Sequence, residues 1–102
     1  MSVEPAALAT TLLLAPLLEE VVFRLGLHAA LLKRLGPGWR ANALVALAFG
    51  LAHALLRSPA LGLGVLAPAL AIGWVYERWR RLWPCVALHA AFNAAWLLAA
   101  GP

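Results

Sequence analysis

Two carboxylates and a guanidinium stand in the middle of a long apolar stretch, at Glu19, Glu20 and Arg24 within residues 6–32. A charge near the centre of a bilayer costs about 2.5–3.5 kcal/mol on insertion scales, so such groups are rare unless they pair or perform a function. Residues four apart share a helix face, so Glu20 and Arg24 can form a buried ion pair. Glu19 is turned away by about 100° and is not matched by Arg24 in the same way. The stretch predicts one anchored carboxylate and one that is free for chemistry.

Four apolar runs explain a composition that is 65% hydrophobic and 12% charged over 102 residues. They cover about residues 5–32, 41–56, 60–76 and 85–100, each close to the roughly 20 residues that cross a bilayer. A helical bundle in water is the alternative, but four short helices with so few polar residues cannot present four solvated faces. We therefore expect an all-α, polytopic membrane helical bundle of about four transmembrane helices, forming a single domain over residues 1–102.

Basic residues concentrate in the connections between the runs, and their distribution predicts topology. The first and third connections hold six of them: Lys33, Arg34, Arg40, Arg78, Arg80 and Arg81. By the positive-inside rule this face is cytoplasmic and both termini lie outside. The net charge of +4 thus reflects contact with the lipid bilayer and predicts no nucleic-acid partner. The pattern leaves the oligomeric state open.

Small residues and breakers suggest how the spans pack. Ala46, Gly50 and Ala54 at four-residue spacing would let helices approach closely, as would a second stripe at Ala87, Ala91, Ala95 and Ala99. Pro16 cannot donate to the carbonyl of the preceding turn, which predicts a kink before the carboxylates. The third span reads as scaffold, and Glu77, followed by arginines, reads as part of a solvated interfacial cluster.

Further polar residues lie on other spans and could face the free carboxylate. His53 lies on the second span, whereas His89 and Asn93, four apart, share a face of the fourth. At 1.5 Å per residue, Glu19, His53 and Asn93 lie about 18–21 Å from the nearest basic residues, and His89 about 12 Å. We expect these groups to converge, while His28 extends the Glu20–Arg24 face as a supporting residue.

This set of groups is sufficient for amide hydrolysis. A carboxylate can activate water, a histidine can share the proton, and a histidine or asparagine can stabilise an oxyanion. One glutamate with two histidines would also satisfy a catalytic zinc site, although the HExxH arrangement is absent. No serine or cysteine lies in register with these groups, and the lone Cys85 reads as a small apolar packing residue.

Three motifs, in order and on successive spans, carry a family resemblance: Glu19-Glu20-x-x-Phe23-Arg24, Phe49-x-x-x-His53 and His89-x-x-x-Asn93. Together they resemble the CPBP (Abi) family of CAAX-processing and bacteriocin-processing intramembrane proteases, over about residues 15–96. The resemblance implies an endopeptidase of glutamate or metal type. In that reading Glu19 activates water with help from His53, Glu20 and Arg24 position it, and His89 and Asn93 support the oxyanion.

Typical members of that family have further spans before the first motif, so the chain is expected to be a minimal core or a fragment. The short form also resembles the small CAAX-type proteases associated with bacterial C-terminal sorting signals. That likeness implies a bacterial-type inner membrane as the location and a membrane-anchored protein or peptide as substrate, cleaved near its C-terminus. Two other hypotheses stay open: a non-enzymatic immunity or scaffold protein that keeps the motif residues for packing, and a small proton or ion pathway.

Overall fold

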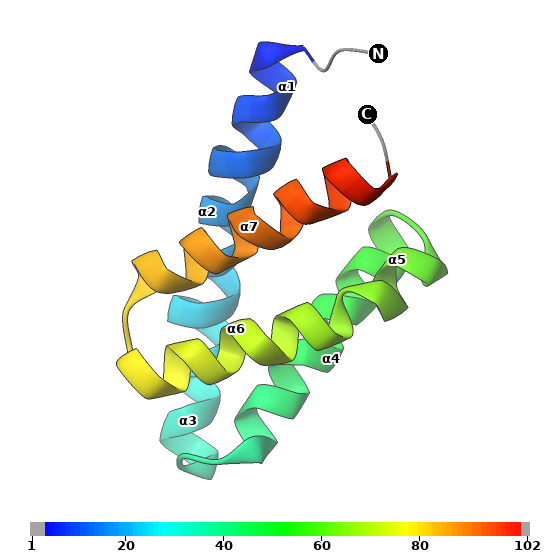
Figure 1. Cartoon of the computed structure of the whole chain (residues 1–102). Helices are drawn as coiled ribbons and strands as arrows, with labels where there is room; N and C mark the ends of the chain where they lie inside the picture. The colour runs from blue at the N-terminus through cyan, green and yellow to red at the C-terminus, as the bar shows by residue number, and fades with distance from the viewer. Residues whose placement is uncertain (1–3, 101–102) are drawn as a thin grey trace.

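The computed structural model describes residues 4–100, and these residues contain four helices long and apolar enough to cross a bilayer (Figure 1). The first, Pro5–Leu35, is continuous and comprises α1 (Pro5–Ala9), η1 (Thr10–Leu14), α2 (Ala15–Glu20), η2 (Val21–His28) and α3 (Ala29–Leu35). The others are α4 (Trp39–Leu56), the pair α5 (Pro59–Gly64) and α6 (Leu66–Trp79), and α7 (Leu82–Ala100). The predicted all-α membrane bundle is confirmed.

Local sequence signals set the ends of the first helix. The Glu4 side chain accepts hydrogen bonds from the backbone N–H groups of Ala6 and Ala7, and Pro5 occupies the first turn, where no donor is needed. The helix ends at Leu35 and is capped by Gly36, whose φ of 77° suits glycine, and Gly38 at φ 131° completes the turn into α4.

One side of the first helix is buried at every fourth residue: Pro16, Glu20, Arg24, His28 and Leu32. On a pure α-helix, four such steps would drift by about 160° around the axis. The π-helical segment η2, which lies within this stretch, offsets the drift, because i to i+5 bonding winds more residues into each turn. The Ala29 N–H, for example, reaches the Arg24 carbonyl. The buried polar residues therefore form a single line.

The π-helical turn η1 lies directly before Pro16, where the sequence predicted a break in regular geometry. Its bonding runs five residues back, with the Ala15 N–H donating to the Thr10 carbonyl. In that register the partner of the Thr11 carbonyl is the N–H of residue 16, which proline lacks. The Asn93 side chain of α7 donates to this carbonyl instead, at 2.9 Å. Membrane helices tolerate proline when a neighbouring helix supplies the missing bond in this way.

The backbones of the second and third spans are in direct contact, as the stripe at Ala46, Gly50 and Ala54 predicted. A Cβ added to Gly50 would lie 2.9 Å from the Gly62 carbonyl oxygen, and one added to Gly62 would lie 2.6 Å from the Ala54 Cβ. Farther along, Gly73 of α6 leaves room for the Asn42 side chain, which donates to the Leu70 carbonyl at 3.0 Å. Small residues thus set the distance between these helices.

The stripe of alanines on the fourth span was predicted to allow close helix packing, but it does not face the other described spans. Ala87, Ala91, Ala95 and Ala99 are all exposed, whereas Cys85 and His89 are buried. The polar side chain of His89 decides the orientation, because it needs hydrogen-bond partners that lipid does not offer. The buried state of Cys85 confirms that residue as a packing group.

The remaining surface suits a lipid environment. Large apolar side chains are exposed on every span, and Trp39, Trp74, Trp79 and Trp83 are each at least half exposed. These tryptophans lie near the first and third connections, as an interfacial belt would. The chain is a multi-pass membrane protein by its helices, while its predicted orientation relative to the cytoplasm stays a prediction.

Candidate active site

Glu19 lies between two histidines contributed by two other spans. Its Oε1 atom is 3.7 Å from Nε2 of His53 on α4 and 3.6 Å from Nε2 of His89 on α7. The same oxygen is shielded from solvent and has no hydrogen-bond partner among residues 4–100, although the Glu19 side chain as a whole is 34% exposed. The site thus joins three spans around an unsatisfied carboxylate oxygen.

Both histidines are held by the ring nitrogen that faces away from Glu19. His53 Nδ1 lies 2.8 Å from the Phe49 carbonyl oxygen, which can only accept, so Nδ1 carries the proton in that contact. His89 Nδ1 lies 2.6 Å from Glu20 Oε2. With Nδ1 donating, each neutral ring directs an unprotonated Nε2 towards Glu19. The two rings are therefore prepared to accept a proton at the same place.

Phe49 holds the ring orientations from behind. Its ring lies 4.4 Å from the His53 ring and 5.8 Å from the His89 ring, between centroids. Phe23, from the first motif, meets Phe49 edge-on at 4.9 Å. The two aromatic residues of the motifs thus pack directly against the polar groups, and edge-on aromatic pairs of this kind add about 0.5–1.5 kcal/mol.

Glu20, next in sequence, has a completely different environment. Its side chain is fully buried, with Oε1 accepting from Arg24 Nε at 2.8 Å and Oε2 paired with His89. Arg24 is also fully buried, and its Nη2 donates to the Ala69 carbonyl at 3.2 Å. The predicted Glu20–Arg24 ion pair is confirmed, and it reaches two other helices.

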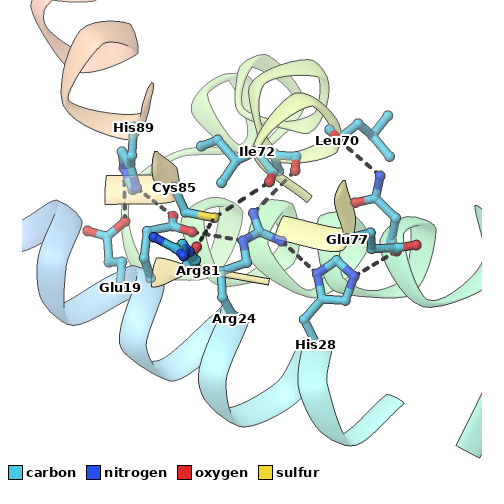
Figure 2. A network of polar contacts seen from close by, with 12 residues as sticks. Glu19, Arg24, His28, Leu70, Ile72, Glu77, Arg81, Cys85 and His89 are labelled. Atoms are coloured by element: carbon cyan, nitrogen blue, oxygen red, sulfur yellow. Dashed lines mark hydrogen bonds and ion pairs between the residues drawn. The ribbon is translucent and has the colours of Figure 1, made fainter. Parts of the chain in front are cut away.

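The line of polar contacts continues beyond Arg24 to His28 and Glu77, for which the sequence predicted only supporting or surface roles. Arg24 Nη1 lies 3.2 Å from His28 Nδ1, and His28 Nε2 lies 2.8 Å from Glu77 Oε2 (Figure 2). Glu77 was predicted to be solvated, but its side chain is only 16% exposed and also accepts from the Gly38 N–H. The prediction failed because α6 ends beside η2, which places Glu77 against a histidine from another span.

Asn93 is on the predicted face of α7, but the bond it makes is to the first helix. Its Nδ2 donates to the Thr11 carbonyl, two turns before the carboxylates. His89, which the depth estimate placed too shallow, is instead the residue beside Glu19. Counting residues from the basic loops ignores helix tilt, and this is why the estimate ranked the two residues in the wrong order.

A family model described as type II CAAX prenyl endopeptidase Rce1-like matches residues 2–95 of the chain. The chain belongs to this family. No curated protein and no solved structure matches it. Membership in the Rce1-like family agrees with the resemblance seen in the motifs and supports a membrane-embedded protease acting on a protein or peptide.

The donor set around Glu19 raises the question of a metal, because an Rce1-like endopeptidase could be of glutamate or metal type. Two imidazoles and one carboxylate are the donor types of a catalytic zinc site. Among residues 4–100, however, no group of three or more histidine, cysteine, aspartate or glutamate side chains is arranged to hold a metal ion. Metal dependence therefore stays a question for experiment.

Proposed function

We propose that this Rce1-like protein is an intramembrane endopeptidase that hydrolyses a peptide bond near the C-terminus of a membrane-associated protein, with Glu19 as the base that activates water. The observation that carries the proposal is the unsatisfied Glu19 Oε1, shielded from solvent yet within 3.7 Å of two histidine nitrogens. A buried oxygen without a partner costs stability, so its persistence favours a group kept ready for a ligand.

The first step follows from these positions. A water molecule beside Glu19 gives a proton to the carboxylate, and its oxygen forms a bond to the carbonyl carbon of the substrate. His53 assists by accepting and returning the proton at Nε2. When the tetrahedral intermediate collapses, the C–N bond breaks and the proton passes to the leaving nitrogen, which balances the reaction without a covalent enzyme intermediate.

His89 and Asn93 would support the oxyanion. The Glu20 carboxylate on Nδ1, at 2.6 Å, compensates a positive charge on the His89 ring, as the buried carboxylate does in a catalytic triad. Once the His89 ring has taken up a second proton from water at Nε2, it can donate that N–H to the oxyanion, and it keeps the proton when the intermediate collapses. Asn93 uses one amide N–H on Thr11, and an amide nitrogen carries a second N–H that remains for the substrate.

Glu19→Gln tests the proposal, because it keeps the shape of the side chain and removes the base. The purified protein is incubated with membrane-anchored candidate substrates encoded by neighbouring genes, and products are identified by mass. We expect Glu19→Gln to lower the cleavage rate by about 10²–10⁴-fold, the usual contribution of a general base. Glu4→Gln, the same change at an exposed helix cap, serves as the control and should cleave normally.

Retained cleavage by Glu19→Gln would overturn the proposal. A purely structural role for the motif residues makes the opposite prediction, with Glu19 and His53 variants behaving as wild type in every assay. Repeating the reaction with a chelator separates the two chemistries. Activity unaffected by the chelator supports water activated by glutamate alone, whereas activity that is lost on chelation and restored by zinc supports a metal.

A further inference from the structure

An unbroken line of polar contacts leads away from the candidate active site towards the opposite end of the first helix (Figure 2). It passes from Glu19 to His89, Glu20 and Arg24, then to His28 and Glu77, through contacts of 3.6, 2.6, 2.8, 3.2 and 2.8 Å. Glu77 Oε1 ends the line by accepting from the Gly38 N–H at 3.3 Å. Glu77 and His28 belong to none of the three motifs.

The chemistry of the groups fixes the direction of these bonds. Arginine can only donate, so His28 must accept from Arg24 at Nδ1. A neutral His28 then carries its proton on Nε2 and donates it to Glu77. In this line of contacts, Glu77 is the group beyond His28 that can accept this proton. Without Glu77, nothing in the line holds the His28 proton on Nε2, and Nδ1 is no longer kept free to accept from Arg24.

Glu77 also has other potential partners close by in sequence. Arg78, Arg80 and Arg81 follow it, yet Arg78 lies over the Trp79 ring, and Arg80 Nε donates to the Glu77 backbone carbonyl. The ion-pair contact recorded for the Glu77 side chain within residues 4–100 is with His28. A carboxylate at the end of a membrane helix has turned inward to meet a fully buried histidine.

We infer that Glu77 and His28 are positioning residues for the reaction, acting on the active site through Arg24 and Glu20. Glu77 fixes the tautomer of His28, and His28 fixes the guanidinium of Arg24. Arg24 then holds Glu20, whose second oxygen keeps the His89 proton on Nδ1 and leaves Nε2 facing Glu19. The inference rests on the proposed function, because only a reaction at Glu19 makes the state of His89 matter.

Two substitutions of Glu77 test this in the cleavage assay. Glu77→Leu removes the acceptor, and we expect kcat to fall about tenfold, near the lower end of what outer partners of site histidines contribute in metal sites, with KM unchanged. Glu77→Gln keeps a carbonyl oxygen for His28 but loses the charge, so its kcat should lie between wild type and Glu77→Leu. Arg78→Gln, at the adjacent exposed position, should match wild type.

A second measurement needs no activity. Ring nitrogen NMR of histidine-labelled protein in detergent reports which nitrogen carries the proton in His28 and His89. We expect Glu77→Leu to change the ring signals of both histidines and Arg78→Gln to change neither. Thermal unfolding of the same samples separates this from a general loss of structure, because a purely structural Glu77 would lower the folded fraction and leave the kcat of folded molecules intact.

A wild-type kcat in folded Glu77→Leu, or unchanged His89 signals, would overturn the inference. If Glu77→Leu does not fold, the test rests on Glu77→Gln, where a wild-type kcat has the same meaning. The two proposals fail separately. Cleavage that survives Glu19→Gln removes the proposed function, whereas cleavage that is abolished by Glu19→Gln and unaffected at Glu77 removes only the positioning role.

Discussion

Glu19 and Glu20 are adjacent in sequence, yet the protein treats their carboxylates in opposite ways. Both oxygens of Glu20 are bonded, at 2.6 and 2.8 Å, in a fully buried setting. The histidine nitrogens beside Glu19 are 3.6 and 3.7 Å from its Oε1 atom, and this oxygen has no hydrogen-bond partner within residues 4–100. A rotation of about 100° around one helix separates a group that is fixed from a group that can take up a new ligand. We infer that the hydrogen-bonded line of Glu20, Arg24, His28 and Glu77, called the saturated line below, holds the site around Glu19 in place.

The largest effect should come from breaking the saturated line at its centre. Arg24→Ala removes the donor that Glu20 Oε1, His28 Nδ1 and the Ala69 carbonyl share in a buried setting. Removing one partner of a buried ion pair costs about 3–5 kcal/mol. We expect Arg24→Ala to lower the free energy of unfolding by that amount, measured by denaturation in detergent micelles.

Arg34→Ala is the matched control, because Arg34 is exposed on the same helix. It should unfold like wild type. Glu19→Gln should also be close to wild type in stability, since Glu19 makes no short contact. The comparison between the two carboxylates breaks down if Glu19→Gln destabilises the protein as much as Arg24→Ala does.

A smaller effect, on rate rather than stability, is expected at His53. Its one hydrogen bond is to the Phe49 carbonyl within its own helix, so His53→Gln removes little that holds the spans together. We expect kcat to fall about 10²-fold, the lower end of general acid–base contributions. The unfolding midpoint should not move. A loss of stability with a normal kcat would instead show that His53 has a structural role, like the residues of the saturated line.

The smallest effect concerns Asn93, which could belong to either region. Asn93→Leu leaves the Thr11 carbonyl without its donor and should cost about 1 kcal/mol of stability. Pro16→Ala restores a backbone N–H opposite that carbonyl, so Asn93→Leu should cost less in the Pro16→Ala background. A double-mutant cycle of unfolding free energies measures the difference.

The same four proteins also separate the structural role of Asn93 from a role in the reaction. A role at the oxyanion predicts that Asn93→Leu lowers kcat equally with and without Pro16. A purely structural role predicts that Pro16→Ala restores stability and kcat together. Unfolding costs that are the same in both backgrounds would show that the bond to Thr11 does not replace the one that proline omits.

Much of this arrangement could be predicted from residue types and spacing. The four spans follow from hydrophobic length, and the Glu20–Arg24 pair follows from the four-residue repeat of a helix. The meeting of Glu19 with His53 and His89 was predicted because buried polar groups must converge when lipid offers them no partner. These are consequences of solvation and helix geometry, which residue types and their spacing reveal.

What could not be predicted depends on which faces meet. Glu77 was assigned to solvent because arginines follow it, and nothing in its own segment indicates that α6 ends against His28. The alanine stripe of α7 was assigned to close helix packing on residue size, but the needs of His89 decided the rotation of that helix. Asn93 could not be matched to Thr11, because the open carbonyl there arises from Pro16 together with a π-helical turn.

The π-helical segment Val21–His28 has a consequence for how the chain can vary in length. Glu20 and Leu32 are twelve residues apart and lie on the same buried side of the helix. In an ordinary α-helix, a separation of eleven residues would already bring two side chains within about 20° of the same direction. The surplus residue is unnecessary for spanning the bilayer. It is what brings Arg24 and His28 into register between the ends, so a one-residue deletion here would preserve a membrane helix and abolish the polar line.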